Sequence, residues 1–289
     1  MPEGDTIHRA ARTLHTALSG QRIEHFESVL AHLTRVDADA PIAGRVVERV
    51  EARGKHLLMW LSEAEPSPVR RGASLVLRTH MRMHGSWHIY RPGERWQRPR
   101  HEMRIVIATA PYVAVAFAVP VAEFVDAVAV EREGPIAELG PDPLSDSFDA
   151  AAAVARLQAR GEVEIADALL DQRAIAGIGN VFKSEILFAA GVSPFTPVRA
   201  LSADTLARVV AIAGRQMRAN AGDAGATAIG GRRTTNRLDP SARLWVYGRS
   251  GLSCRRCGTP IQRARQGPDV RSTYWCERCQ PREYVEANL

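Results

Sequence analysis

The sequence predicts an α+β protein with two domains: an N-terminal β-sandwich with a flanking helix, and a C-terminal helical domain that carries a zinc-finger β-hairpin. Short β-type runs separated by turn residues occupy the chain before residue 120. Helical periodicity replaces them after residue 148. Two pairs of cysteines stand near the C-terminus, and 289 residues suffice for two ordinary domains.

The first helix is expected over residues 6–18, with Asp5 as its N-cap and Gly20 as its stop. After it come short runs rich in Val, Leu, Ile and Trp, separated by turns such as ARGK, RRGA and ERWQRPR. Regular short strands with turn signals are typical of a sandwich or a barrel-like domain. The expected strands are residues 45–51, 56–61, 74–79, 86–91, 103–109 and 112–119.

The strand signal fades near residue 126, and the next residues are rich in Pro, Gly and acidic side chains. The expected domains are therefore a β-sandwich at 1–130, a linker at 131–148, a helical domain at 149–248 and a zinc finger at 249–284. Helices are expected over residues 149–160, 164–172, 180–190 and 203–219, followed by a Gly- and Arg-rich loop near 221–243.

The cysteines give the strongest chemical signal. Two CxxC pairs, separated by 18 residues, suit a tetrahedral zinc ion with a β-hairpin between them that turns over QGPD. Four thiolates leave no open coordination position, so one structural Zn²⁺ is expected. A pair of disulfides is the alternative, but disulfides are rare inside cells. The ligands are Cys254, Cys257, Cys276 and Cys279.

Positive charge is concentrated in the same region. The net charge is +6, and residues 232–282 hold 12 arginines against three acidic residues. Such a basic block is typical of a protein that binds a polyanion, although a solvated charged face is an alternative. The chain has only two lysines, Lys55 and Lys183. A position that remains lysine in such a chain indicates a need for an ammonium group.

A glycine turn precedes one expected helix. In GIGN, residues 177–180, Asn180 can cap the helix, and the amides of such a helix start can hold a phosphate. An ordinary turn between helices is the alternative. No apolar run approaches the roughly 18–20 residues of a membrane span, and no signal peptide is visible. We expect a monomeric, cytoplasmic protein, associated with the nucleoid if bacterial.

Together these segments resemble the formamidopyrimidine-DNA glycosylase and endonuclease VIII family of base-excision repair enzymes. The resemblance runs through MPEG, RGKHL, HMRMHGSW, the segment LLDQRAIAGIGNVFKSEILFAAGVSP and LWVYGRSGLSCRRCGTPI. It implies a β-sandwich, a helix-two-turn-helix domain and a zinc finger. It also implies DNA with damaged bases or abasic sites as the partner, with no nucleotide cofactor.

The resemblance assigns roles to individual residues. We expect Met1 to be removed, because the next residue is small, and Pro2 would then be the nucleophile that forms a Schiff base. Glu3 would protonate the opening sugar and transfer protons during elimination, although it could also be a first-turn helix carboxylate. Lys55 and Arg271 would hold phosphates beside the lesion, and Arg271 would support δ-elimination.

Asn180 would hold phosphate from the helix-two-turn-helix motif. The loop HMRMHG would fill the gap that a displaced base leaves, with Arg82, Met83 and His84 as candidates. An apolar, adaptable Met suits a wedge between bases. A Met buried in a strand is the alternative for Met83.

Two departures from the family pattern bear on the substrate. Thr6 occupies a position where the family usually has Glu. The purine-directed branch has a DPRRFG-like segment whose Arg and Phe enter the duplex, whereas this chain has AVPVAEFVD. The pattern favours the endonuclease VIII branch and oxidised pyrimidines. A purine glycosylase of the formamidopyrimidine type and a non-catalytic zinc-ribbon DNA binder are the alternatives.

Overall fold

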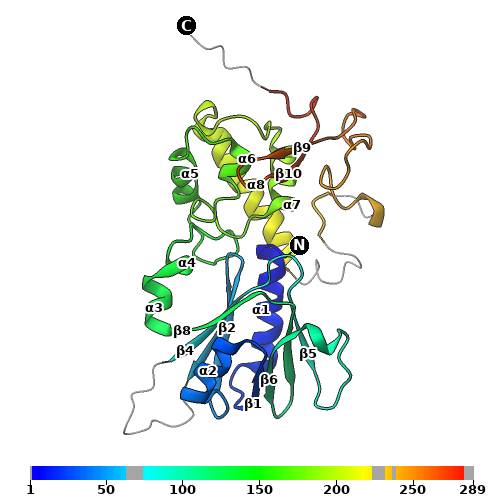
Figure 1. Ribbon diagram of the computed structural model, residues 1–289. Helices are drawn as coiled ribbons and strands as arrows, with labels where there is room; N and C mark the ends of the chain where they lie inside the picture. Colours follow the sequence, from blue (N-terminus) through cyan, green and yellow to red (C-terminus); the bar gives the residue numbers. More distant parts are fainter. Residues whose placement is uncertain (1, 63–73, 223–231, 236–238, 283–289) are drawn as a thin grey trace. The chain divides into compact units, whose positions relative to one another are not determined.

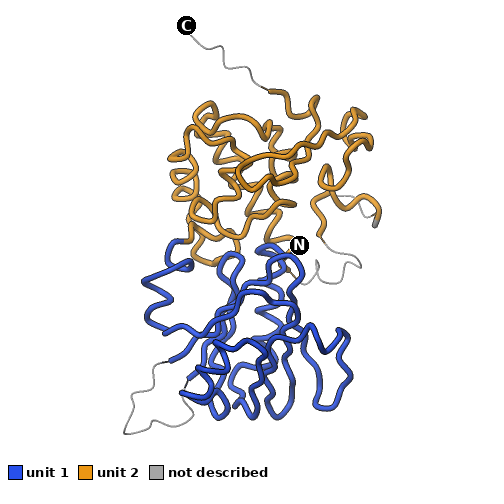
Figure 2. Tube along the Cα trace, in the orientation of Figure 1, with its two compact units in different colours: residues 1–138 blue, residues 139–289 orange. Residues whose placement is uncertain are grey.

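The computed structural model describes residues 2–62, 74–222, 232–235 and 239–282. The chain divides into two compact units, residues 1–138 and 139–289 (Figure 2). Met1, the expected RRGA turn, most of the expected Gly- and Arg-rich loop and the last residues of the expected finger lie outside the described residues.

The described residues of the first unit form two antiparallel sheets of four strands each (Figure 1). One sheet has the order β1-β6-β7-β5 and the other β2-β3-β4-β8. The strands are β1 Ile23–Ser28, β2 Val46–Arg53, β3 His56–Ser62, β4 Leu75–His80, β5 Ser86–Tyr90, β6 Met103–Thr109, β7 Val113–Phe117 and β8 Val121–Asp126. Helices α2 Ala31–Asp39, α3 Ala127–Arg132 and α4 Gly134–Ala137 complete this unit, with a short 3-10 turn at Arg100–Glu102.

Helix α1, Gly4–Leu18, buries one apolar face in the core of this unit. That face contains Ile7, Ala11, Leu14 and Leu18. The predicted N-cap is wrong. The Glu3 carbonyl already accepts the N–H groups of Thr6 and Ile7, at 2.9 and 3.1 Å, so the helix begins at Gly4. Asp5 therefore lies in the first turn.

Five helices and strands of the first unit were not predicted: α2, α3, α4, β1 and β8. Strand β1 has a register shift between Ile23 and His25, which interrupts the alternation of apolar and polar residues. Strand β8 follows Pro120 directly, and Pro is a turn signal rather than a strand signal. Local sequence patterns do not predict these two strands. Pairing with the neighbouring strands of each sheet determines their conformation.

The second unit is mainly helical, and its described residues form a core among the helices and a smaller apolar cluster at the finger. Its helices are α5 Ala150–Gln158, α6 Ile165–Ala168, α7 Asn180–Ala190 and α8 Ala203–Ala221, with 3-10 turns at Val198–Ala200 and Pro240–Ala242. The finger hairpin consists of β9 Gln262–Gln266 and β10 Arg271–Trp275, paired antiparallel.

One helical prediction needs correction. Helix α6 ends at Ala168 rather than near residue 172, because the Gln172 side chain is bound into the following glycine turn. It accepts the Gly177 N–H at 3.0 Å and donates to the Ile178 carbonyl at 3.1 Å. The segment expected to be a linker contains helix α4. The boundary between the two compact units also lies in this segment, after Glu138.

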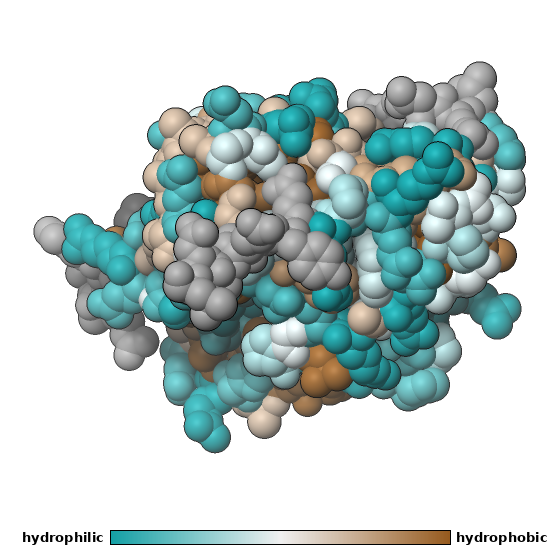
Figure 3. Space-filling view, turned by 90° about the horizontal axis from the view of Figure 1, so that it is seen from above, coloured by the Kyte–Doolittle hydropathy of each residue, from teal (hydrophilic) through white to brown (hydrophobic). Residues whose placement is uncertain are grey.

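Among the described residues, no helix has both the length and the apolar character needed to cross a membrane. The face shown in Figure 3 is largely hydrophilic, and its apolar residues form small separate patches.

Candidate functional site

The N-terminus of α1 positions Pro2 and Glu3. Pro2 is half-buried and immediately precedes Glu3, the N-cap, which is completely buried. The positive end of a 15-residue helix therefore faces the region of the Pro2 nitrogen. The buried Glu3 carboxyl and Pro2 therefore both lie at a helix start that favours negative charge.

Thr6, the residue that departs from the family pattern, lies in the first turn of the same helix. Its hydroxyl donates to Asp5 Oδ1 at 3.3 Å, and Arg9 Nη1 lies 3.4 Å from Asp5 Oδ2. Asp5 is completely buried. The carboxylate of this turn is therefore supplied by Asp5 and is paired with a cation on the next turn.

Lys55 lies at the tip of a two-residue hairpin turn between β2 and β3. Arg53 and His56 form the last pair of the ladder, and Gly54 has a left-handed φ of 58°, which favours glycine. Arg53 makes a two-pronged ion pair with Glu131 of α3, at 2.8 and 2.9 Å. The turn that presents Lys55 is thus anchored directly behind its tip.

The segment Arg82–His84 forms an exposed turn after β4. The Gly85 N–H closes this turn on the Met81 carbonyl at 2.9 Å, and a Cβ at Gly85 would lie 2.6 Å from that oxygen. Met83 is 50% exposed. The alternative of a buried strand Met is therefore wrong for Met83, and Met81 is the buried one.

A histidine pair links the Lys55 hairpin to this turn. His56 on β3 lies opposite His80 on β4, with the ring centroids 4.9 Å apart in an edge-to-face arrangement. His56 Nδ1 lies 3.1 Å from Arg78 Nη1, and His80 Nδ1 accepts the Arg82 N–H at 3.1 Å. Arg78 is held in turn by Glu123 of β8.

The two imidazoles are kept neutral. Burial, the other histidine and the nearby cations lower the pKa of His56 to about 3. Burial, then Arg82, Lys55 and Arg78 lower the pKa of His80 to about 4. Lys55 and Arg82 therefore both lie close to the pair. The two loops that carry them lie at the same end of the sheet, where β3 begins and β4 ends.

This pair predicts acid sensitivity. The folded pKa values lie below the ordinary value of 6.5, so the unfolded chain binds protons more readily. The contribution of neutral histidines is fully present above pH 6.5, and it falls as the pH drops from 6.5 to about 4 for His80 and about 3 for His56. The melting temperature of His56→Gln should fall less steeply between pH 6.5 and 4 than that of the wild type. Equal slopes would contradict the prediction, and His25→Gln, an exposed site, is the control.

In the second unit, the glycine turn leads into α7. The N-cap is Gly179, so the prediction that Asn180 is the N-cap is wrong. Asn180 is the first helical residue, is 7% exposed, and its Oδ1 has no hydrogen-bond partner among the described residues. Leaving a buried polar atom unsatisfied costs about 1–3 kcal/mol, which a hydrogen-bonding ligand would recover. Rotating the amide by 180° would place its N–H donors at this position.

Arg271 is the first residue of β10, at the tip of the finger hairpin. Its guanidinium Nη2 lies 3.4 Å from Asp269 Oδ2, and both side chains are exposed. Val270, directly before it, has a left-handed φ of 52°, which a β-branched residue rarely adopts. The backbone is therefore strained next to the arginine that is expected to bind phosphate.

The four cysteines converge at the base of this hairpin. Their Sγ atoms all lie within 4.8 Å of one another, and no disulfide joins them. The distances between the Sγ atoms of Cys254 and Cys279 and of Cys257 and Cys276 are 3.9 and 3.4 Å. A tetrahedron with Zn–S bonds of about 2.3 Å has edges of about 3.8 Å. This donor set fits one structural zinc ion.

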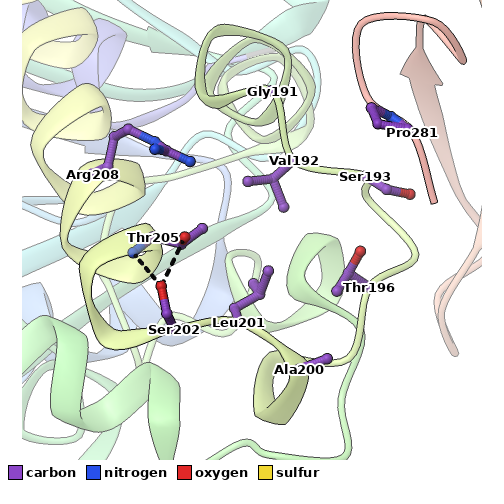
Figure 4. Close-up of a pocket in the computed structure, with 10 residues that line it drawn as sticks. All are labelled: Gly191, Val192, Ser193, Thr196, Ala200, Leu201, Ser202, Thr205, Arg208 and Pro281. Atoms are coloured by element: carbon purple, nitrogen blue, oxygen red, sulfur yellow. Dashed lines mark hydrogen bonds between the residues drawn. The ribbon is translucent and has the colours of Figure 1, made fainter. Parts of the chain in front are cut away.

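A cavity of about 250 Å³ lies elsewhere in the second unit (Figure 4). Its lining includes Val192, Leu201, Ser202, Thr205 and Arg208. The Ser202 hydroxyl accepts the Thr205 N–H at 3.1 Å and donates to Thr205 Oγ1 at 3.0 Å, so these groups cap α8. None of the residues predicted to bind DNA lines this cavity.

Sequence reasoning missed several buried or partly buried polar residues that support these groups. The histidine pair is one, although both residues stand inside the motifs RGKHL and HMRMHGSW. Another is Glu185 on α7, which accepts the N–H groups of Trp245, Val246 and Tyr247 at 2.8 Å each. Glu185 thereby fixes the backbone that leads into the finger. No local pattern could have identified partners about 60 residues apart.

Three family models match the chain. The formamidopyrimidine-DNA glycosylase N-terminal domain matches residues 1–120, and the H2TH domain of the same enzyme matches residues 139–229. The zinc finger found in FPG and IleRS matches residues 251–282.

Similar proteins are known over the whole length. A probable endonuclease 8 2 of Streptomyces coelicolor is 39% identical over 97% of this chain and 94% of the relative. A DNA-(apurinic or apyrimidinic site) lyase Nei2 of Mycolicibacterium smegmatis is 36% identical over 97% and 99%. The Lactococcus lactis Fpg, solved with abasic-site DNA, superimposes with a TM-score of 0.78 at 20% identity and covers 97% of this chain and 100% of that chain. The predicted fold class and the structural zinc are confirmed.

Proposed function

The chain belongs to the formamidopyrimidine-DNA glycosylase and endonuclease VIII family, and we propose that it begins base excision with the N-terminal amine of Pro2. The protein is a DNA glycosylase with abasic-site lyase activity in base-excision repair. The position of Pro2 at the positive end of α1 carries the proposal, because this end disfavours a protonated amine and an amine attacks only when unprotonated. Family membership sets aside the alternative of a non-catalytic zinc-ribbon DNA binder.

The first step joins Pro2 to the sugar. The Pro2 nitrogen attacks C1′ of the damaged nucleotide, and the bond from C1′ to the base breaks, so that the base leaves with the bonding electrons and takes a proton from water. Glu3, which is buried, accepts the proton that the attached nitrogen releases and passes it to the ring oxygen, so that the sugar opens and a cationic iminium forms between the nitrogen and C1′.

The later steps cut the strand. The iminium withdraws electrons, so a proton leaves C2′ and the bond between C3′ and the 3′ phosphate breaks. A second elimination releases the 5′ phosphate, and water then hydrolyses the iminium and frees Pro2. Lys55 and Arg271 hold the phosphates beside the sugar, and Arg271 supports the second elimination.

Borohydride trapping tests this function. The protein is incubated with duplex DNA that contains one abasic site, in the presence of borohydride, which reduces the iminium to a stable amine. A covalent complex is expected, and mass spectrometry should place the DNA on Pro2. A complex attached to a lysine, or no complex, would refute the assignment.

Oxidised pyrimidines are the proposed substrates. The segment that differs from the purine-directed branch includes a connection of only three residues between β7 and β8, Ala118–Pro120. Such a short connection leaves little chain to enter a duplex, so the exposed turn Arg82–His84 would fill the gap left by the displaced base. Excision of thymine glycol and dihydrouracil should exceed excision of 8-oxoguanine. The reverse order would support the purine alternative.

Asn180 is proposed to hold a DNA phosphate. Asn180→Ala should weaken binding of abasic duplex about tenfold, by a similar factor in every flanking sequence, since phosphate contacts position a protein without specifying sequence. Asn180→Asp keeps the size and adds a charge that repels phosphate, so it should weaken binding further. Fluorescence anisotropy measures both variants, and a loss confined to one flanking sequence would contradict the role.

The proposal also covers the oligomeric state, the cellular location and the cofactors. We propose that the protein acts as a monomer on DNA in the cytoplasm, at the nucleoid in a bacterial cell. The reaction through Pro2 uses no nucleotide cofactor, and the zinc ion supports the finger without entering the chemistry.

A further inference from the structure

One of the two lysines of the chain is completely buried. Lys183 lies on α7, one turn after Asn180, and its Nζ donates to Thr273 Oγ1 at 2.8 Å and to the Ser272 carbonyl at 3.4 Å. Both acceptors belong to β10, the strand that begins at Arg271. An ammonium group therefore joins the helix to the finger hairpin inside the second unit.

The hydrogen bonds continue from β10 into β9. Thr273 is completely buried and donates to Gln266 Oε1 at 2.8 Å. Gln266 Nε2 then donates to Glu164 Oε2 at 2.6 Å and to the Pro194 carbonyl at 3.0 Å. Both strands of the hairpin are thus bound to helical segments by buried polar groups.

The charge of Lys183 is balanced nearby. Burial raises the pKa of Asp167, and the positive charge of Lys183 opposes that rise. The Asp167 carboxylate also lies against Gly267 in the hairpin turn, where a Cβ would come within 2.4 Å of Oδ1. A buried charge is tolerated when it has a countercharge and hydrogen-bond acceptors. Lys183 has both.

Lysine suits this position better than arginine. The acceptors on β10 are a hydroxyl and a carbonyl, which a compact ammonium can bind together. A guanidinium would bring five N–H donors in a planar fork to a completely buried position, and each donor would need an acceptor there. This requirement explains why the position remains lysine in a chain whose other basic residues, except Lys55, are arginines.

We propose that Lys183 is a positioning residue for DNA binding. It fixes the strand that begins at Arg271 to the helix that begins at Asn180. The distance between these two side chains, both proposed to bind DNA phosphates, is thereby kept constant. The proposal rests on the proposed function, because Asn180 and Arg271 receive their roles there. The zinc ion holds the base of the hairpin, and Lys183 holds its strands.

The test compares variants of the full-length zinc-loaded protein on duplex DNA containing tetrahydrofuran, a stable abasic analogue. Lys183→Met keeps the length of the side chain and removes the charge and the hydrogen bonds. It should raise the Kd about tenfold while zinc content stays at one per chain. Thr273→Val should raise the Kd several-fold, and Thr273→Ser, which keeps the hydroxyl, should bind like the wild type.

Combination with Arg271→Ala separates positioning from simple stabilisation. If Lys183 acts through Arg271, Lys183→Met should change the Kd of the Arg271→Ala protein less than about twofold, because coupled residues are not additive. The proposal would be overturned if the increase in Kd of the double variant equalled the product of the increases of the two single variants. An unchanged Kd of Lys183→Met would also overturn it. If Lys183→Met loses zinc, Thr273→Val is measured in the same two backgrounds, and the same two outcomes support or overturn the proposal.

Failure of the proposed function has a different signature. If Pro2 is not the nucleophile, the wild type gives no borohydride-trapped complex, whatever the effect of Lys183→Met on Kd. If only the positioning role is wrong, the wild type is trapped normally and Lys183→Met binds tetrahydrofuran DNA as the wild type does.

Discussion

Replacement of Pro2 by glycine is expected to reduce the yield of borohydride-trapped complex with abasic duplex DNA at least about 100-fold. Proline has a secondary amine, whose iminium is permanently charged and withdraws electrons at any pH. The primary amine of glycine forms an imine that must first gain a proton. Glycine also loses the ring that fixes the nitrogen at the start of α1. Trapping is measured by gel shift of labelled DNA after reduction.

A second variant isolates the nitrogen itself. A short uncleaved extension before Pro2 keeps the ring and turns its amine into an amide, which is not a nucleophile. This variant should also give no trapped complex. Melting temperatures and zinc content control for folding of both proteins. Trapping of Pro2→Gly at wild-type efficiency would show that another amine reacts.

Loss of zinc is expected to weaken DNA binding at least about 100-fold, because the metal folds the base of the hairpin that presents Arg271. Cys276 is completely buried and belongs to the apolar cluster of the finger together with Phe188 and Ile261. Cys276→Ser should therefore lose the metal and the DNA binding together. The measurements are zinc content by mass spectrometry and Kd by anisotropy.

The matched control is Ser253→Ala, which changes an exposed side chain next to a ligand pair and leaves all four thiols. It should bind zinc and DNA like the wild type. If Cys276→Ser lost zinc and still bound abasic DNA normally, the ion would not support the DNA-binding surface.

Local signals in the sequence predicted most of the framework. The cysteine spacing specified the zinc finger, because four thiolates at that spacing have few other uses. The runs that became β3, β4 and β6 are rich in Val, Leu and Ile and were predicted with nearly correct bounds. Helix starts were less accurate. Asp5 and Asn180 are good capping residues, but in each case a residue before it is the N-cap.

The contacts that position the site were beyond local reasoning. Gln266 meets Glu164 across 102 positions of the chain, and Lys183 meets Thr273 across 90. The edge-to-face contact of His56 and His80 depends on the register of two strands, which the tertiary fold decides. The sequence showed which groups could act, and their supporting partners were visible only after folding.

The ion pair between Arg271 and Asp269 gives the finger tip an internal competitor for DNA. With both side chains exposed, such a pair is worth at most about 1 kcal/mol, so in the proposed phosphate contact Asp269 would lower the affinity of Arg271 by no more than about fivefold. A singly charged carboxylate yields to a phosphate diester that is held by several other groups, but a free anion must compete alone. If Arg271 binds phosphate as proposed, Asp269 would make it more selective for a complete DNA backbone than for isolated phosphate ions.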